Sequence, residues 1–120
     1  MWPRDSRAEL GARGEALVAR HLEREGFEIV ARNLRVGRLE LDLVARRAHL
    51  LVVCEVRTRS SRDLVDPIET IDRAKCARIR TAAREWIFGQ RVPHREIRFD
   101  AASVVINESG DDLVYYEAAF

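Results

Sequence analysis

The sequence predicts an α/β protein with a central mixed β-sheet flanked by two main helices. The expected order is αβββαβ, followed by a short final strand. Apolar residues recur at helical spacing in residues 6–25 and 67–88. Residues 38–44 and 51–57 alternate with period two instead, as half-buried strands do. The 120 residues suit a single domain, residues 1–120, with one modest core.

The composition restricts the class of protein. Charged residues make up 34% of the chain and hydrophobic residues 47%, and the net charge is +1. This balance excludes a disordered chain and does not require a nucleic-acid partner, although a local basic surface remains compatible with it. No stretch is apolar over the length of a membrane span, and no apolar run follows the first residues. We therefore expect a cytoplasmic protein without a membrane partner.

The first helix is expected over residues 6–25, with Asp5 or Ser6 as its N-cap and Gly26 at its end. Gly11 and Gly14 each lower helix propensity by up to about 1 kcal/mol relative to alanine. Their presence predicts that this helix packs closely on the sheet. The first strand is then expected over residues 27–34.

The central prediction is an antiparallel hairpin formed by residues 38–44 and 51–57. Pairing of these strands sets Asp42 beside Glu55, with Arg57 two residues further along the same face. Two neighbouring carboxylates repel each other unless a cation lies between them. The pattern is therefore compatible with a divalent-metal site, and equally with acids on a solvated strand face. Leu39, Leu41 and Leu43 are expected on one face of the first strand, and Glu40, Asp42 and Val44 on the other.

An arginine-rich loop is predicted after the hairpin. Residues 57–62 contain Arg57, Arg59 and Arg62 together with three hydroxyl side chains. Arginine, serine and threonine supply many of the contacts that proteins make to nucleic-acid phosphates. The alternative is a flexible, solvated loop.

The second helix is expected over residues 67–88, because Asp66 suits an N-cap and Gly89 suits an end. Its only lysine, Lys75, is also the only lysine of the chain. Helical spacing places Lys75 within the buried stripe, where an ammonium is unfavourable without a partner. Its head group either meets the hairpin acids or reaches past the stripe to water. Strands are expected over residues 97–106 and 113–116.

Several motifs resemble those of the uncharacterised YraN-like family of bacterial proteins, within the restriction-endonuclease-like, PD-(D/E)XK, superfamily. The resemblance covers roughly residues 8–106 and departs from the usual pattern at Leu39, where glycine is usual, and at Arg57, where lysine is usual. The motifs are Gly14-Glu15-Ala16, Gly26-Phe27-x-Ile29, Arg32-Asn33-x-Arg35, Glu40-Leu41-Asp42-Leu43-Val44, Glu55-Val56-Arg57-Thr58-Arg59, Lys75-x-x-Arg78-Ile79 and Arg98-Phe99-Asp100.

The resemblance implies a restriction-endonuclease-like core and a nuclease, or a protein derived from one, that acts on DNA, including branched DNA such as a recombination junction. It implies Mg²⁺ or Mn²⁺ bound by Glu15, Asp42 and Glu55. It also implies a catalytic set of Asp42, Glu55, Arg57 and Lys75, because some superfamily members supply the catalytic lysine from a helix. Arg57, Arg59 and Arg62 are then the expected contacts to nucleic acid.

Other functional classes compete with a nuclease. Arginine at position 57 stays protonated and cannot exchange a proton with water, although it can hold a phosphate. This favours a catalytically inactive module with a nuclease fold that binds nucleic acid or protein. A purely structural partner in a larger complex is a third class. A small nuclease that must reach two DNA strands is expected to form a homodimer.

Overall fold

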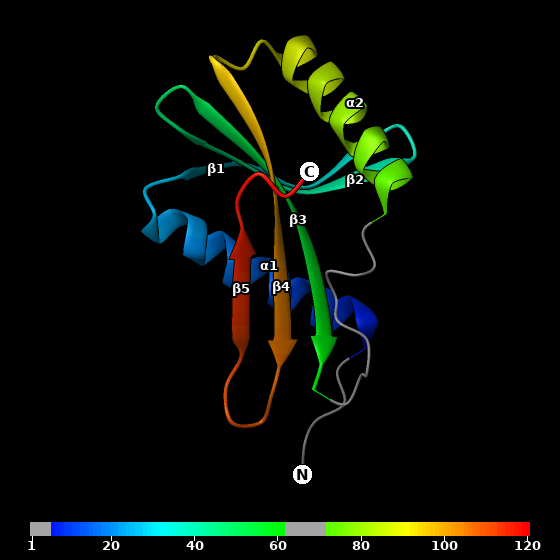
Figure 1. Cartoon of the computed structure of the whole chain (residues 1–120), viewed down its shortest axis with the longest axis vertical. Coiled ribbons are helices and arrows are strands. Elements are labelled where there is room, and N and C mark those ends of the chain that lie inside the picture. Colours follow the sequence, from blue (N-terminus) through cyan, green and yellow to red (C-terminus); the bar gives the residue numbers. More distant parts are fainter. Residues whose placement is uncertain (1–5, 62–71) are drawn as a thin grey trace.

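The computed structural model describes residues 6–61 and 72–120 as an α/β fold with a five-stranded mixed sheet. This confirms the predicted class and element order, which are consistent with a restriction-endonuclease-like core (Figure 1). The sheet order is β1-β2-β3-β4-β5, and β3 and β4 form its one parallel pair. The elements are α1 (Arg7–Arg24), β1 (Glu28–Val36), β2 (Leu39–Arg47), β3 (Leu50–Ser60), α2 (Arg73–Gln90), β4 (Glu96–Ile106) and β5 (Asp112–Tyr116).

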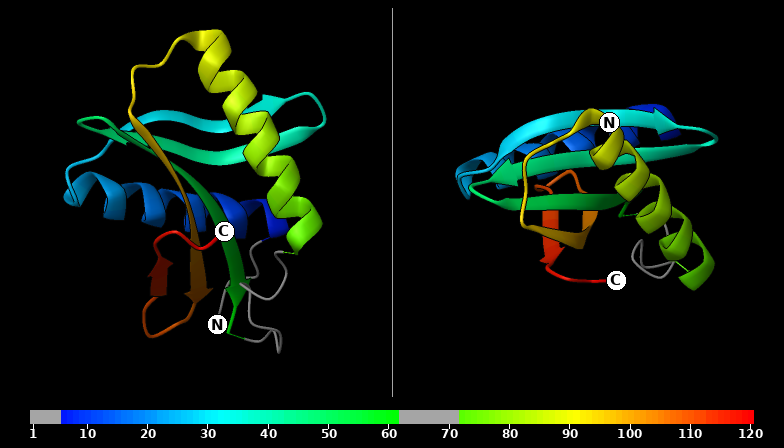
Figure 2. Two further views of the ribbon diagram at one scale, coloured as in Figure 1. Left: turned by 45° about the horizontal axis from the view of Figure 1, so that its top comes forward. Right: turned by 90° about the horizontal axis from the view of Figure 1, so that it is seen from above.

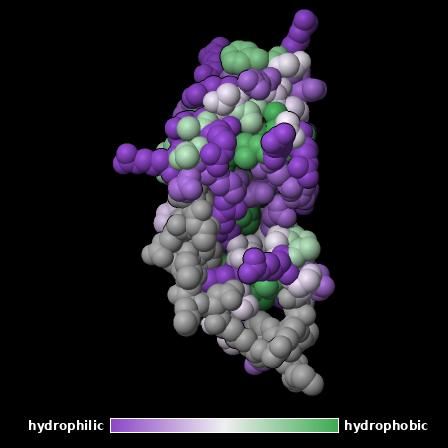
Figure 3. All heavy atoms as spheres, turned by 90° about the vertical axis from the view of Figure 1, so that its right-hand side faces the viewer, coloured by the Kyte–Doolittle hydropathy of each residue, from purple (hydrophilic) through white to green (hydrophobic). Residues whose placement is uncertain are grey.

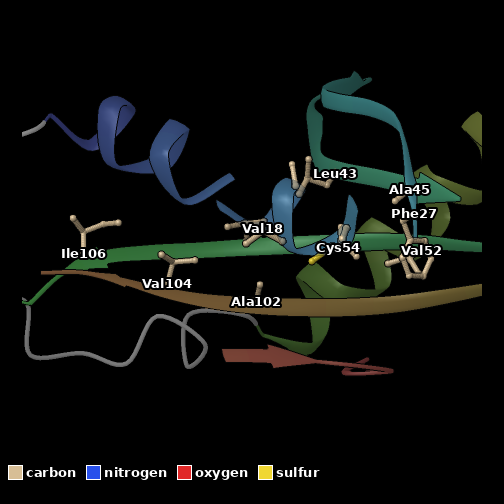
Figure 4. Close-up of a cluster of buried hydrophobic side chains, with 12 residues drawn as sticks. Val18, Phe27, Leu43, Ala45, Val52, Cys54, Ala102, Val104 and Ile106 are labelled. Carbon is tan, nitrogen blue, oxygen red and sulfur yellow. The ribbon is translucent and has the colours of Figure 1, made fainter. Parts of the chain in front are cut away.

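The two helices lie on opposite faces of the sheet (Figures 1 and 2). Helix α1 packs mainly on β3, whereas α2 packs on β2 and β1. Alternation along β3 separates the two cores, because Val52 and Cys54 face α1 while Leu51 and Val53 face α2. Figure 4 shows the cluster on the α1 side. Neither described helix combines the length and apolar character needed to cross a membrane.

The β2–β3 hairpin is longer than predicted, and its turn is only two residues, Ala48 and His49. Ladder pairing extends from Arg47↔Leu50 to Leu43↔Cys54. At the next position the Val56 amide donates to Asp42 Oδ2 at 2.8 Å, so an acidic side chain takes the place of a backbone acceptor.

The prediction that Leu39, Leu41 and Leu43 share a face is wrong. Leu43 packs in the cluster on the α1 side, whereas Leu41 and Leu39 pack in the cluster on the α2 side. This change of side occurs across Asp42, where the regular ladder with β3 stops. A period-two pattern assumes an unbroken strand, so it could not show this change.

The predicted arginine-rich loop is also wrong for residues 57–60. These residues continue β3 and pair in parallel with Ser103–Ile106 of β4. Arg57 and Arg59 therefore have positions fixed by the sheet. Arg62 lies outside the described residues.

Helix α2 differs from the prediction at both ends. Asp72 has an extended backbone, with φ −95° and ψ 169°, and its side chain accepts a hydrogen bond from the Lys75 amide at 2.7 Å. A continuous helix over residues 67–88 is therefore wrong, and its expected start at Asp66 lies outside the described residues. Gly89 lies within α2, which ends at Gln90 and is capped by Arg91 in the left-handed region, with φ 53°.

The two glycines of α1 differ in their surroundings. A Cβ atom added to Gly14 would lie 2.9 Å from Thr58 Cβ. A Cβ atom added to Gly11 would have no neighbouring atom within 4 Å. The prediction that both glycines permit close packing is therefore confirmed for Gly14 and wrong for Gly11. Gly14 allows α1 to approach β3 at the point where the next residue, Glu15, enters the site described below.

This difference predicts stability changes of opposite sign. Gly14→Ala should destabilise the protein by about 1–3 kcal/mol, because the added methyl overpacks the contact with Thr58. Gly11→Ala should stabilise it by up to about 1 kcal/mol, because alanine has the higher helix propensity. Urea unfolding of both variants measures the two changes. Equal effects would contradict a close approach at Gly14.

Candidate metal centre

Three acids from α1 and β2 form a carboxylate cluster. Glu15, Glu40 and Asp42 each offer an oxygen, and these oxygens all lie within 4.8 Å of one another. Glu40 and Asp42 are two residues apart on β2, and their carboxylates lie together at the point that Glu15 approaches. Glu15 reaches them because Gly14 brings α1 close to the sheet. Within the described residues, no lysine or arginine forms an ion pair with any of the three.

Asn33 lies between two of these acids. With its amide nitrogen turned toward them, it donates to Glu40 Oε1 at 3.0 Å and to Glu15 Oε1 at 3.2 Å. The Asn33 backbone is in the left-handed region, with φ 49°, which asparagine tolerates better than most residues. Asn33 thus links an acid of α1 to an acid of β2 and helps to hold the cluster together.

Glu55 is a neighbour of Asp42 and has two cationic partners. Its Oε1 atom is 2.9 Å from Arg57 Nη1 and 3.2 Å from Lys75 Nζ. The Glu55 side chain is only 3% exposed, so these two cations offset the cost of burying its charge. The site therefore has a neutralised part at Glu55 and an acidic part at Glu15, Glu40 and Asp42.

The electrostatics of the acidic part favour a bound cation. Burial and the neighbouring Glu55 raise the pKa of Asp42 to about 8, although the Val56 amide opposes the rise. The pKa of Glu15 is also raised, first by burial and then by Glu40 and Glu55. Without a cation, Asp42 therefore retains its proton near neutral pH. A divalent ion would replace that proton and remove the repulsion among the acids, so the donor set fits a metal.

The structure brings most of the predicted site residues together. Glu15 and Asp42 belong to the carboxylate cluster, and Glu55 lies close enough to Asp42 to raise the pKa of the Asp42 carboxyl. The Lys75 ammonium lies at Glu55, although the Lys75 side chain is still 29% exposed. Arg59 lies two residues beyond Arg57 on β3.

Glu40 is the site residue to which the sequence analysis gave no role. Its alternation with Asp42 was the available signal, because both residues were expected on one strand face. The pattern alone does not separate an acid in a cluster from an acid facing solvent. The approach of Glu15 from α1 shows that Glu40 belongs to the cluster.

Comparison with known proteins gives consistent matches. The sequence model of "Uncharacterised protein family UPF0102" matches residues 14–104. A UPF0102 protein of Sorangium cellulosum is 47% identical over 120 residues, covering 97% of this chain and 83% of the relative. A UPF0102 protein of Nocardioides sp. is 43% identical and covers 88% and 85%, respectively. A third, from Anaeromyxobacter dehalogenans, is 40% identical and covers 97% and 87%.

Proposed function

The chain belongs to the uncharacterised protein family UPF0102, the YraN-like family that its motifs resemble, and we propose that it is a magnesium-dependent nuclease acting on DNA. The carboxylate cluster beside the Glu55–Arg57–Lys75 group is the observation that carries this proposal. It combines oxygen ligands for a divalent ion with cations that can bind a phosphate. Branched DNA is the substrate that the superfamily resemblance favours.

Glu15, Asp42 and Glu55 are the proposed metal ligands, and Glu40 joins them because it shares the cluster. Carboxylate oxygens are suitable ligands for Mg²⁺ and Mn²⁺. When bound, such an ion lowers the pKa of a coordinated water and offsets negative charge on the phosphate that is attacked.

Arg57 and Lys75 have complementary roles in the proposal. The Arg57 guanidinium stays charged and binds the phosphate of the substrate. The Lys75 ammonium can lose a proton, which an arginine cannot do, so Lys75 is the proposed proton-exchanging group. Both cations contact the same oxygen of Glu55, Oε1.

A nucleic-acid-binding protein without nuclease activity is the second candidate. The observation that favours it is the arginine at position 57, which pairs with Glu55 where the superfamily usually has lysine. In that protein Arg57 and Lys75 would contact phosphates without supporting cleavage. A cleavage assay separates the two candidates.

We expect Mg²⁺-dependent cleavage in an assay of single-stranded, duplex and four-way-junction DNA, and we expect Lys75→Met to reduce it about 10²- to 10⁴-fold. This is the usual contribution of a group that transfers a proton in the transition state. Lys75→Arg keeps a cation beside Glu55 but cannot exchange a proton, so it should be nearly as impaired. Arg78→Met, which removes an exposed cation from the same helix, is the matched control.

Three results would change this interpretation. Full activity of Lys75→Arg would show that Lys75 supplies only charge. Full activity of Lys75→Met would exclude the proposed role altogether. DNA binding without cleavage by the wild-type protein would favour the binding module over the nuclease.

A further inference from the structure

The two helices of the protein differ in charge. Helix α1 contains four arginines and three glutamates, a formal charge of +1. Helix α2 contains four arginines, one lysine and one glutamate, a formal charge of +4. The lysine pairs with Glu55, but within residues 6–61 and 72–120 none of the four arginines of α2 forms an ion pair. Seen from the side on which α2 lies, hydrophilic residues cover most of the upper part of the molecule, with apolar residues between them (Figure 3).

Three of these arginines, Arg73, Arg80 and Arg84, form a line along α2 that we call the arginine row. Each residue of an α-helix turns the chain by about 100°, so the three lie within about 40° of one another around the helix axis. They span about 16 Å along the axis, at a rise of about 1.5 Å per residue. Arg78 lies about 120–160° away from each of them, so it is not part of the row.

The arginine row is open to a ligand. Arg73 and Arg84 are exposed, and Arg80 is half-buried. Ala77 and Thr81, which lie between them on the same side of the helix, are exposed as well. The residues through which α2 packs on the sheet are different ones, and they are buried.

The row begins in the part of α2 that reaches the candidate metal centre. Arg73 lies in the first turn of the helix together with Lys75, whose ammonium contacts Glu55. At the other end of the row, the Arg84 guanidinium lies over the ring of Phe99, 5.7 Å from the ring centroid. Phe99 belongs to β4, which pairs with the strand that carries Glu55. The row therefore runs from the turn that holds Lys75 along the outside of α2.

A straight row of arginines is complementary to the backbone of a DNA duplex. Arginine stays charged and binds phosphate oxygens in a bidentate manner. A duplex has a persistence length of about 50 nm, so it is nearly straight over about 16 Å and presents about ten phosphate charges there. Proteins that bind single strands without sequence preference add aromatic rings on which bases stack. No ring lies between Arg73 and Arg84 on this side of the helix, and the exposed ring of Phe88 lies beyond the row.

We propose that the arginine row binds the phosphate backbone of a duplex arm of the DNA substrate. The proposal rests on the proposed function, because it names the part of the substrate that lies beside the cleavage site. The contacts are to phosphates, so they hold the duplex in place without reading its sequence.

The test is fluorescence anisotropy of the full chain with a labelled duplex, in EDTA so that no metal-dependent cleavage consumes the probe, at salt concentrations from 50 to 200 mM. The variant carries Arg73→Gln, Arg80→Gln and Arg84→Gln together. Each phosphate contact contributes about −0.9 to the slope of log affinity against log salt, so this triple variant should have a slope less steep by about 2.7. Across this salt range the wild type should therefore lose about 40-fold more affinity than the variant does.

The matched control carries Arg7→Gln, Arg20→Gln and Arg24→Gln. These three arginines are exposed on α1, on the opposite face of the sheet, and their replacement changes the net charge by the same amount. The control should keep the wild-type slope. Arg78→Gln, on α2 but outside the row, should keep it too. Thermal unfolding confirms that each variant is folded before its affinity is compared.

Several results would overturn the proposal. One is a wild-type slope in the row variant, and another is an equal change of slope in the α1 control, which would reflect net charge alone. An equal loss of affinity for a single-stranded oligothymidine would exclude a site for duplex DNA. So would a wild-type dimer that the row variant converts to a monomer in sedimentation, because a second copy would then cover the row.

Failure of this inference is distinguishable from failure of the proposed function. A reduced slope in the row variant, without cleavage by the wild type, supports the row and counts against the nuclease. Cleavage by the wild type, with an unchanged slope in the row variant, does the reverse. If both hold, the row variant should raise KM for a substrate with duplex arms and leave kcat unchanged, because the row does not contact the reacting phosphate.

Discussion

Asp42→Asn is expected to weaken Mn²⁺ or Mg²⁺ binding by more than about 10-fold and to abolish metal-dependent cleavage. Loss of a residue that only supports a metal ligand commonly costs about 10- to 100-fold in affinity or activity, so loss of a direct ligand should cost at least as much. Asparagine still has a side-chain oxygen that can accept from the Val56 amide, which preserves the contact between β2 and β3. The variant should therefore fold, and calorimetric titration with Mn²⁺ measures the change.

The same substitution should change how stability depends on pH. In the metal-free wild type, the folded protein keeps a proton on Asp42 up to about pH 8, whereas the ordinary pKa is 3.8. Between these values the folded state binds more protons than the unfolded state, so the free energy of unfolding falls as pH rises. The contribution is fully present below about pH 4 and is lost as pH rises through about 8.

Asparagine does not titrate, so the free energy of unfolding of Asp42→Asn should not show this decrease as pH rises. Above pH 8 and without metal, the variant should be more stable than the wild type by more than about 1 kcal/mol, since one unit of pKa shift already corresponds to about that free energy. Denaturant unfolding from pH 4 to pH 9 in EDTA tests the sign. Glu108→Gln, at an exposed position in the β4–β5 turn, is the control and should follow the wild type. A wild-type protein that gains stability across this range, relative to Asp42→Asn, would contradict the raised pKa.

Asp100→Ala is expected to destabilise the protein by about 3–5 kcal/mol, the cost of leaving a buried charge without its partner. Asp100 is fully buried, and its carboxylate accepts from Arg98 Nε and Nη2, both at 2.9 Å. It also accepts from the Tyr115 hydroxyl and from the Ala118 amide at 2.9 Å. One carboxylate thus joins β4, β5 and the residues that follow β5.

Urea unfolding measures this loss, and Glu117→Gln is the control. Glu117 approaches Arg98 at 3.7 Å but its side chain is 69% exposed, so its removal should cost between about 0 and 1 kcal/mol. Asp100 is not part of the carboxylate cluster, so the folded fraction of Asp100→Ala should still bind Mn²⁺. A loss of metal binding in that fraction would give Asp100 a role beyond stability.

The arrangement of the acids in the site is indicated by the sequence only in part. Alternation along residues 38–44 and 51–57 predicted the hairpin, and hence the neighbourhood of Asp42 and Glu55. It could do so because period two fixes which residues share a face wherever a strand is regular. The two main helices and their order were predicted for a similar reason, since helical periodicity is also a local property.

Tertiary structure decided the composition of the site. The regular ladder between β2 and β3 stops at Asp42, where a side chain replaces a backbone acceptor. The hydrophobic periodicity of the sequence does not show such a replacement. Glu40 belongs to the carboxylate cluster because α1 approaches β3 closely at Gly14, and this approach brings Glu15 to β2. The Lys75 ammonium contacts Glu55 because of where α2 lies over the sheet, and the sequence left open whether it would reach Glu55 or solvent.

The sequence by itself therefore determined the fold class, the hairpin and the list of acids from which a site could form. Only the tertiary structure decided which acids share a cluster and which one is neutralised by Arg57 and Lys75. The physical reason is that hydrophobic periodicity reports only on residues that are close together along one helix or strand. The charge balance of a site depends instead on distances between elements, which packing sets.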